Sequence, residues 1–269
     1  MNLAAIRAEW TLRSLDISSE TAAWDSTAEE YLFQEKINFD EDPFLRFVAE
    51  KTALTPEMRT LDVGCGTGAY SVAMAQRVAQ ADGVDLSPRM VELGTVYAKE
   101  HGIDNLRLRV CNWHDCDTEA IRGKYDLVFA HTTPAVADCS TLLKLCEVSR
   151  SCCFLCRPAR RTDRIFDELR RIAGIRTSSD SDDSVAFAFD TLWGLGYNPE
   201  VSYAGTRWRP ERSLEDAERW FLGRLRGRAV LSADAERRVK DYLREVSKDG
   251  TVREEINTTL VNMYWSVLR

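Results

Sequence analysis

The sequence has 269 residues, of which 44% are hydrophobic and 29% are charged, with 14 glycines, 7 prolines and no internal repeat. This composition excludes a disordered or fibrous chain and is typical of a compact globular protein with a sizeable core. The net charge of -7 argues against a protein that binds nucleic acid, because neutralising phosphates requires a surplus of Lys and Arg. A small molecule is the favoured partner.

Residues 1–57 are predicted to form a helical N-terminal cap. In FLRFVAEKTAL, apolar residues recur at the three- and four-residue spacing of a helix, and Pro56 closes the segment. The first residues, MNLAAIRAEWTLRSLD, carry scattered charges, so we expect neither a signal peptide nor an anchor there. No run of about 18 apolar residues occurs, which argues against a membrane partner and favours a cytoplasmic location.

Residues 58–269 are predicted to form an α/β domain, because apolar strands alternate with helical stretches. The five predicted strands cover 59–63, 81–85, 105–111, 125–130 and 151–157, and the helices between them cover 69–80, 88–100, 117–122 and 138–148. Such alternation is the pattern of a parallel, doubly wound sheet. Ser87 and Pro88 suit the N-cap and the first position of the second of these helices.

Longer helices follow the fifth strand and make helical additions at about 160–250. They are predicted over 161–175, around 190–200, 213–227 and 231–247. Two extended runs, EVSYAGTRW at 200–208 and INTTLVNMYWSVL at 256–268, are predicted to add strands at the far edge of the sheet. The polar segment 177–184 is predicted to be a mobile linker.

The eight cysteines follow no disulfide framework, so reduced thiols are expected. Cys153 and Cys156 lie an odd number of residues apart on a predicted strand and therefore face opposite sides of the sheet, which excludes a zinc knuckle. Further metal donors fall near the ends of two predicted strands, namely Cys111, His114, Cys116, His131 and Cys139. No pair of them has the tight spacing of a structural zinc site, so we predict no metal.

The segment LDVGCGTGAY, residues 61–70, places Gly64, Gly66 and Gly68 directly after a predicted strand and before a helix. Glycines at the carboxyl end of a strand let the backbone turn sharply and approach a ligand, which predicts a nucleotide loop. The segment alone does not identify the nucleotide. Gly64, Gly66 and Ala69 also satisfy the GxGxxA pattern of dinucleotide dehydrogenases.

Two carboxylates accompany this loop. Asp85 ends the second predicted strand, where a carboxylate can accept both hydroxyls of a ribose, so it indicates a nucleoside without saying which one. Asp62 lies two residues before Gly64, and its burial is unfavourable unless it meets a donor or a cation. A ligand with an ammonium or sulfonium group satisfies that need, whereas a pyrophosphate does not. The alternative for Asp62 is a carboxylate tied to backbone N–H groups.

LDVGCGTG, followed by VDLSPRMVELG, resembles motif I and the next acidic motif of the class I S-adenosylmethionine-dependent methyltransferases that act on small molecules, over about 59–157. The resemblance implies a Rossmann-like methyltransferase fold with a seven-stranded, mostly parallel sheet and an antiparallel strand near 256–268. It implies S-adenosylmethionine as the cofactor. The glycines would pass beside its methionine part, Asp62 would lie near its amino group and Asp85 would hold the ribose.

The same resemblance implies that the residues after the third strand hold the adenine. Asn112 and Trp113 occupy that place. Such enzymes usually have an acidic residue where this chain has Asn112, so this contact is a departure from the family pattern. For Trp113, ordinary core packing is an equal alternative.

Methyl transfer from a sulfonium is an in-line displacement, so most of the catalysis can come from holding the acceptor and the methyl group in line. A base is needed only if the acceptor must lose a proton. The segment FAHTTPAVAD, after the fourth strand, offers His131 as that base and Thr132 and Thr133 as groups that orient the substrate. A histidine that only shapes the pocket is the alternative. The segment lacks the NPPY-type motif of enzymes that methylate nucleic-acid bases.

The segment AAWDSTAEEY, residues 22–31, resembles the N-terminal helix that covers the cofactor in many small-molecule members of the family. Trp24 and Tyr31 would then line a lid, although a core position suits Trp24 equally well. Arg157, at the end of the fifth strand, could meet a substrate carboxylate or serve as an ordinary ion-pair partner. The arginine clusters around 157–171 and 207–228 likewise fit either solvated, paired helix faces or an anionic substrate.

The sequence therefore predicts a methyltransferase that moves a methyl group from S-adenosylmethionine to a small molecule. One alternative is a protein that keeps the fold and the cofactor site but only binds, as a scaffold or sensor. A nicotinamide-dependent oxidoreductase is the third reading, and Asp62 argues against it. The acceptor and the oligomeric state are not encoded in any motif of the chain.

Overall fold

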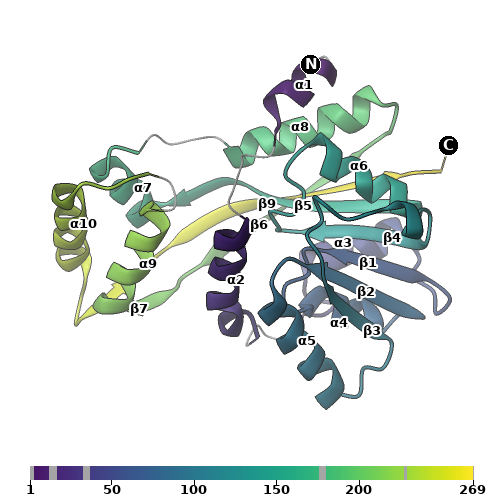
Figure 1. Cartoon of the computed structure of the whole chain (residues 1–269), viewed down its shortest axis with the longest axis horizontal. Helices are drawn as coiled ribbons and strands as arrows, with labels where there is room; N and C mark the ends of the chain where they lie inside the picture. The colour runs from purple at the N-terminus through teal and green to yellow at the C-terminus, as the bar shows by residue number, and fades with distance from the viewer. Residues whose placement is uncertain (1–2, 12–16, 33–36, 176–179, 227–228, 269) are drawn as a thin grey trace. The chain divides into compact units, whose positions relative to one another are not determined.

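The computed structural model describes residues 3–11, 17–32, 37–175, 180–226 and 229–268 (Figure 1). The chain forms two compact units. The first comprises residues 1–157, 184–203 and 261–269, and the second comprises residues 158–183 and 204–260.

A seven-stranded sheet is the centre of the fold, as predicted. Its strand order is β3-β2-β1-β4-β5-β9-β6. The strands are β1 (Arg59–Val63), β2 (Gln80–Asp85), β3 (Leu106–Val110), β4 (Tyr125–His131), β5 (Ser149–Asp163), β6 (Glu200–Trp208) and β9 (Ile256–Ser266). The first five pair in parallel, and the order reverses between β1 and β4. Ligands of open α/β sheets bind at such a reversal, beyond the carboxyl ends of the strands.

The last strand, β9, runs antiparallel to β5. The backbone N–H of Val267 donates to the carbonyl of Ser151 at 2.8 Å, and Thr258 Oγ1 donates to the carbonyl of Ala159 at 3.0 Å. Residue numbers therefore rise along β5 as they fall along β9, which is the antiparallel register. This arrangement confirms the strand predicted over 256–268.

Some helices of the first unit begin at a residue whose side chain caps them. The helices of this unit are α1 (Leu3–Glu9), α2 (Ile17–Leu32), α3 (Pro43–Lys51), α4 (Ala69–Ala75), α5 (Pro88–Glu100), α6 (Cys139–Val148) and most of α8 (Asp180–Gly194), with a 3-10 turn at Glu119–Ile121. Ser87 Oγ accepts the N–H of Met90 at 3.0 Å and so starts α5. Asp138 starts α6 in the same way. Side-chain caps of this kind satisfy backbone donors that have no partner inside the helix.

Two apolar layers cover the parallel strands. On one face, buried residues of β4 and β5 such as Val128 and Cys153 form a core with Ile6 of α1, Leu142 of α6 and Leu192 of α8. On the other face an aromatic cluster lies beneath α3, with the ring of Phe44 5.8 Å from that of Phe129 and 6.2 Å from that of Phe154. The glycine loop leaves β1 between these layers.

The second unit has its own small core. Its helices are α7 (Arg164–Ile172), α9 (Leu214–Arg226) and α10 (Ala233–Val246), and its short strands β7 (Glu211–Ser213) and β8 (Thr251–Arg253) pair antiparallel. Phe166, Phe221 and Val239 are among the buried residues that hold the three helices together. The helices predicted over 213–227 and 231–247 are thereby confirmed.

Three element boundaries differ most from the prediction. Helix α4, predicted over 69–80, ends at Ala75, because Gln80 belongs to β2, where it pairs with Arg59. The fifth strand continues past Arg157 to Asp163, since β9 supplies a partner for the additional residues. The helix expected around 190–200 is α8, which begins at Asp180, so residues 180–184 of the predicted linker are helical. Residues 177–179 lie outside the described residues.

Candidate functional site

The glycine loop after β1 has the shape that the sequence predicts. Gly64, Gly66 and Gly68 have φ values of +70°, +55° and +83°, a region that favours glycine. Gly68 is also the N-cap of α4. At Gly64 the requirement is steric as well, because an added Cβ would lie 1.9 Å from Thr133 Oγ1. The loop therefore presents bare backbone at the carboxyl end of β1.

Asp85 joins this loop to the start of α5. Its Oδ2 accepts the N–H of Gly66 at 2.7 Å, and its Oδ1 accepts the N–H of Ser87 at 2.9 Å. Burial raises the pKa of Asp85, although these donors act in the opposite direction. The carboxylate thus holds two backbone turns beside the place where a ribose is expected.

Asp62 finds its donor inside the protein. Only 2% of its surface is exposed, and its Oδ2 accepts the hydroxyl of Ser71 at 2.7 Å. Burial raises the pKa of Asp62 to about 7, while the hydrogen bond from Ser71 opposes the shift. The backbone N–H of Ser71 also bonds to the carboxylate, which favours the alternative that the sequence left open, a carboxylate tied to backbone N–H groups. Because Asp62 already has a donor inside the protein, its burial is weaker evidence for a methyltransferase over a dehydrogenase than the sequence alone suggested.

The two residues expected at the adenine, Asn112 and Trp113, have different surroundings. Asn112 lies in the turn after β3, where its Nδ2 donates to Asp115 Oδ2 at 2.6 Å. Trp113 is 2% exposed, and its Nε1 donates to the carbonyl of Thr141 at 3.0 Å. Trp113 belongs to the core on the α6 face, which favours the packing alternative. An adenine contact remains a prediction for both residues.

His131 ends β4 and lies in the aromatic cluster beneath α3. Its ring centroid is 3.9 Å from that of Tyr70 and 4.8 Å from that of Phe44. Burial lowers the pKa of His131 to about 3, and its buried Nε2 has no hydrogen-bond partner among the described residues. The imidazole is therefore neutral at physiological pH and weakly basic, which favours a histidine that shapes the pocket.

The residues after β4 and β5 form the side of the site opposite β2. Thr132 has a φ of +49° and donates its N–H to the carbonyl of Cys156 at 2.9 Å, while Thr133 Oγ1 accepts the N–H of Ala135 at 3.1 Å. Arg157 donates to the carbonyls of Val136 and Thr133. No carboxylate of the described residues pairs with Arg157, so its charge is not neutralised there.

Helix α2 lies over the start of α5, beside the glycine loop (Figure 1). Asp25 Oδ1 accepts the N–H of Arg89 at 3.1 Å and the hydroxyl of Ser87, and Arg89 Nη2 pairs with Glu29 Oε1 at 2.7 Å. These contacts of Asp25 and Glu29 with Ser87 and Arg89, which we call the polar latch, were not predicted. Their signal was present, because Asp25 lies inside the segment that resembles a lid.

The two aromatic residues predicted for the lid lie on α2 as expected. The rings of Trp24 and Tyr31 meet edge to face at 6.2 Å, and Tyr31 is 38% exposed. The carbonyl of Tyr31 accepts the hydroxyl of Thr67, from the glycine loop, at 3.3 Å. A cavity of about 330 Å³ lies at this end of α2, and Thr67 and Ala69 contribute to its wall.

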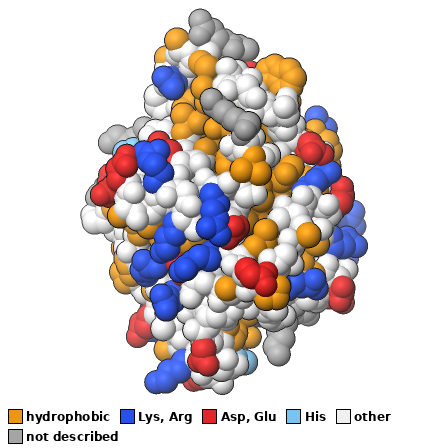
Figure 2. All heavy atoms as spheres, turned by 90° about the vertical axis from the view of Figure 1, so that its right-hand side faces the viewer, with side chains coloured by type: hydrophobic (Ala, Val, Ile, Leu, Met, Phe, Trp, Pro, Cys, Tyr) orange, Lys and Arg blue, Asp and Glu red, His pale blue; other side chains and the backbone are white. Residues whose placement is uncertain are grey.

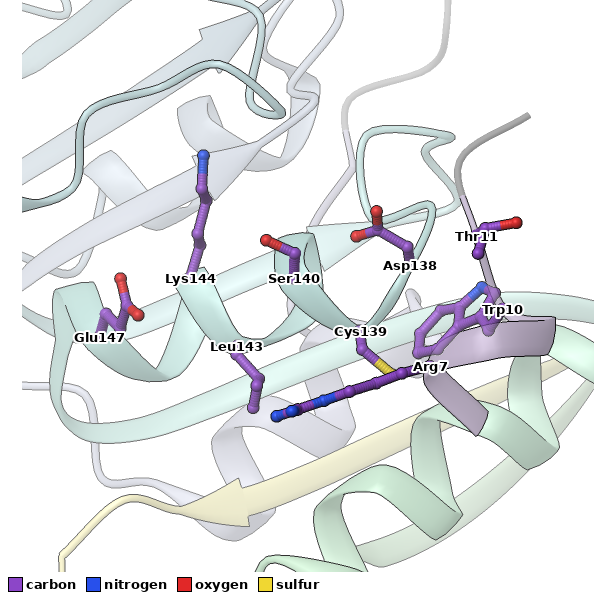
Figure 3. Close-up of a pocket in the computed structure, with 9 residues that line it drawn as sticks. All are labelled: Arg7, Trp10, Thr11, Asp138, Cys139, Ser140, Leu143, Lys144 and Glu147. Carbon is purple, nitrogen blue, oxygen red and sulfur yellow. The ribbon is translucent and has the colours of Figure 1, made fainter. Parts of the chain in front are cut away.

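A second cavity, of about 410 Å³, lies on α1 and α6 and contains none of the predicted site residues (Figure 3). Its lining residues include Arg7, Trp10, Asp138 and Lys144. Among the residues that the structure describes, no group of three or more His, Cys, Asp or Glu side chains is placed to hold a metal ion. No described helix has both the length and the apolar character needed to cross a membrane.

Many arginines of the predicted clusters pair with acids close by. Arg171 lies 2.6 Å from Glu168, and Arg226 lies 2.7 Å from Glu236. On the face of the molecule in Figure 2, Lys and Arg side chains likewise lie among Asp and Glu side chains. These pairs fit the interpretation of solvated helix faces, and Arg157 stands apart from them.

Comparisons with known proteins agree with this geometry. A family model described as a methyltransferase domain matches residues 54–172, the segment that contains β1–β5 and the glycine loop. A ubiquinone biosynthesis O-methyltransferase from Xanthomonas campestris pv. campestris is 38% identical over 84 residues, which are 31% of this chain and 34% of the relative. One from Acinetobacter baumannii is 27% identical over 104 residues, 38% of this chain and 44% of the relative. The chain thus matches less than half the length of these curated relatives.

Solved structures share the fold at low sequence identity. The YcgJ protein of Bacillus subtilis superimposes with a TM-score of 0.51 at 17% identity, over 81% of this chain and 96% of its own. A phosphoethanolamine N-methyltransferase of Haemonchus contortus gives 0.52 at 15% identity, over 93% of this chain and 59% of its own. With the sheet order and the glycine loop, the family match over residues 54–172 is consistent with a methyltransferase domain of the class I, S-adenosylmethionine-dependent type.

Proposed function

We propose that this protein transfers a methyl group from S-adenosylmethionine to a small-molecule acceptor. The observation that carries the proposal is the hydrogen bond from Gly66 to Asp85, which joins a left-handed glycine loop, at the reversal of strand order, to the carboxylate expected to bind a ribose. Gly64, Gly66 and Gly68 would lie along the methionine part of the cofactor. The Asp85 oxygens would accept the ribose hydroxyls, and Asp62 would lie below the amino group.

S-adenosylmethionine supplies a methyl group on a sulfonium, which an acceptor takes up by in-line displacement. The protein's part is to hold the acceptor, and such positioning can supply much of the rate enhancement. The segment after β4 provides Thr132 and Thr133 for this purpose. His131 is too weakly basic to remove a proton near neutral pH, so we infer that the acceptor attacks through a lone pair that is already free.

Arg157 indicates an anionic acceptor. Its guanidinium bonds only to backbone carbonyls among the described residues, and its Nε is buried without a partner. Burial lowers the pKa of Arg157 to about 10, which still leaves it charged at neutral pH. A carboxylate on the acceptor would supply the counter-ion that the described residues do not provide, since a buried charge without a partner is strongly unfavourable. We place the enzyme in the cytoplasm.

The first test is a calorimetric titration of cofactor-stripped protein with S-adenosylmethionine, S-adenosylhomocysteine and NADH. We expect micromolar binding of the two adenosyl ligands and none of NADH. Asp85→Ala should weaken that binding by about tenfold or more, because it removes hydrogen bonds to a charged group. Asp82→Asn is the control, since Asp82 is a buried carboxylate on the same strand that binds Tyr125 and Arg109 instead of the glycine loop.

Binding of NADH alone would overturn the proposal, and unchanged affinity in Asp85→Ala would remove the ribose assignment. A second assay follows S-adenosylhomocysteine release with small acceptors that differ only in a carboxylate. We expect the carboxylate to lower KM, and Arg157→Met to abolish the difference. A protein that binds the cofactor but releases no product with any acceptor would be a binding protein, a role for which the weakly basic His131 is the supporting observation.

A further inference from the structure

The middle of β9 carries a buried amide that has no hydrogen-bond partner. Asn262 is 1% exposed, and neither its Nδ2 nor its Oδ1 bonds to any of the described residues. In the unfolded chain water bonds to both atoms, so their burial without partners is unfavourable. Because most buried polar groups in folded proteins are hydrogen-bonded, such an exception requires a function or a bound molecule to explain it.

The strand register places Asn262 in one row with His131. A backbone hydrogen bond at the ends of β5 and β9 sets the antiparallel register, and counting back from it puts Tyr264 opposite Phe154 and Asn262 opposite Cys156. The rings of Tyr264 and Phe154 lie 5.0 Å apart, as that register requires. Cys156 in turn pairs with His131 of β4. His131, Cys156 and Asn262 therefore lie side by side across three neighbouring strands.

This row faces α3. Cross-strand neighbours point to the same face of a sheet, and so do residues two apart on one strand, so the row shares its face with Phe154. Phe44 of α3 packs on that face, with its ring 6.2 Å from that of Phe154 and 4.8 Å from that of His131. All of these residues belong to the first unit. The unpaired amide of Asn262 therefore lies on the same side of the sheet as the His131 imidazole.

His131 has an unpaired buried atom as well. Its Nδ1 lies 3.2 Å from Thr132 Oγ1, which leaves Nε2 buried without a partner among the described residues. The Nε of Arg157, the residue after Cys156, is a third case. Of the nine buried side-chain nitrogen and oxygen atoms without partners in the described part of the chain, four belong to His131, Arg157 and Asn262. Unmet hydrogen-bonding capacity is therefore concentrated at this end of β4, beside the expected acceptor.

The two side chains of the row specify the chemistry of a ligand. The imidazole of His131 and the carboxamide of Asn262 are both neutral near pH 7. A carboxamide donates and accepts at the same time, and Nε2 can do either, because Thr132 Oγ1 can be the donor or the acceptor in its bond to Nδ1. A hydroxyl or a carboxamide on the ligand satisfies such groups, whereas a carboxylate offers only acceptors. A carboxylate suits the charged guanidinium of Arg157 instead.

We propose that Asn262 determines acceptor specificity by binding a neutral hydroxyl or carboxamide group of the acceptor, with His131 Nε2 as a second contact. The bound group supplies the hydrogen bonds that the described residues leave unmade. That this ligand is the methyl acceptor rests on the proposed function. Asn262 holds the acceptor and takes no part in bond making. Phe44, which packs on His131, turns aside to admit the group.

The first test of this site is unfolding in urea without any ligand. Asn262→Leu replaces the unpaired amide by an apolar side chain of similar size, so the midpoint of unfolding should rise. Asn105→Leu is the control, because Asn105 Nδ2 donates to the carbonyls of Ala75 at 2.8 Å and Val78 at 2.9 Å, and its loss should lower the midpoint. An unchanged or lower midpoint in Asn262→Leu would show that the folded protein satisfies this amide, and would overturn the inference whatever the enzyme's activity.

The second test uses benzamide, which carries a carboxamide on a flat ring, and toluene, which has the ring without the polar group. Each is titrated into wild type and both variants, with and without S-adenosylhomocysteine, and binding is measured from the rise in Tm. Wild type and Asn105→Leu should bind benzamide more tightly than toluene. Asn262→Leu should bind benzamide about tenfold more weakly than wild type does, the effect of one or two lost hydrogen bonds.

Two results of the titrations would overturn the site. One is equal affinity of wild type for benzamide and toluene, and the other is a benzamide affinity that Asn262→Leu leaves unchanged. With S-adenosylhomocysteine bound, the preference for benzamide should persist, because the acceptor and the cofactor occupy the enzyme together. A preference that depends on Asn262 in a protein that binds no S-adenosylhomocysteine would support the site and contradict the proposed function alone.

Discussion

Gly64 and Thr133 meet so closely that a Cβ atom added to Gly64 would lie 1.9 Å from Thr133 Oγ1. Gly64 begins the cofactor loop after β1, and Thr133 lies in the segment after β4 that is expected to face the acceptor. The two loops belong to the strands between which the sheet order reverses. A change at either residue is therefore transmitted to both halves of the site.

Gly64→Ala should lose both stability and cofactor affinity. The substitution places a side chain at a φ of +70° and forces Thr133 to move. The backbone effect alone costs about 1–2 kcal/mol, and the displaced threonine adds to it. Urea unfolding measures the first effect and titration with S-adenosylhomocysteine the second.

Gly102→Ala is the matched control, because Gly102 has a φ of +66° and no neighbour within 4 Å of the added atom. It should show the backbone cost without a change in cofactor affinity. Equal affinities for the two variants would mean that the Gly64–Thr133 contact does not shape the site.

Asp62 should make stability fall with rising pH. Its pKa is raised from 3.8 to about 7 in the folded protein by burial, so between these values the folded state holds a proton that the unfolded state has released. Folding stability then decreases as pH rises through this window and levels off above it. Asp62→Asn cannot titrate, and its stability relative to wild type should rise by a few kcal/mol over the same range, measured by urea unfolding at successive pH values. A difference that does not change with pH would disprove the shift.

The fold could be predicted because its signals are local. Each of these signals depends only on neighbouring residues, as in strands of apolar residues, helix caps such as Ser87 and the glycines after β1. The sheet and the glycine loop were predicted correctly from them. The end of α4 and the length of β5 could not be predicted, since both depend on partners far along the chain. Gln80 is drawn into β2 by Arg59, and β5 is extended by β9.

The site was predictable only in part, for the same reason. Residue type predicts Asp85 as a ribose ligand, and the structure places it against the glycine loop, but nothing in the sequence shows that Trp113 donates to Thr141 in the core. The sequence also predicted His131 as a candidate base, whereas the structure packs Phe44, from a distant helix, against its ring. The protonation of a side chain depends on such long-range packing, so spacing along the chain does not reveal it.

His131→Phe should keep most of the methyl-transfer activity. Burial lowers the pKa of His131 from 6.5 to about 3, so the residue does not titrate in the folded protein near neutral pH. Phenylalanine preserves the contacts with Phe44 and Tyr70. A loss of kcat of about 100-fold or more, with unchanged affinity for S-adenosylhomocysteine, is what removal of a general base produces and would contradict this account.

The same variant has a pH signature in stability. Between about 6.5 and 3 the unfolded wild type binds a proton at this histidine that the folded state does not, so the wild type loses stability as pH falls through that range. His131→Phe should lack this component. His101→Phe is the control, because His101 stacks on Tyr97 at the exposed end of α5.

Asp25→Ala should open the lid. Ala28 is the one buried residue among the α2 side chains that the structure describes, so apolar packing contributes little and the polar latch to Ser87 and Arg89 holds the helix. Without Asp25, bound S-adenosylhomocysteine should dissociate about fivefold to tenfold faster, since a hydrogen bond to a charged group is lost. Stopped-flow displacement measures this rate.

Glu29→Ala distinguishes the effect of the exposed ion pair from that of the Asp25 hydrogen bonds. It removes the ion pair between Glu29 and Arg89, whose side chains are 55% and 40% exposed. Exposed pairs contribute little and weaken with salt, so its effect on the dissociation rate should be small and should vanish at high ionic strength. The effect of Asp25→Ala should persist there, because Asp25 Oδ1 is directed at the hydroxyl of Ser87, which is fully buried. Dissociation rates that are equal in wild type and Asp25→Ala at every salt concentration would show that α2 does not close over the cofactor.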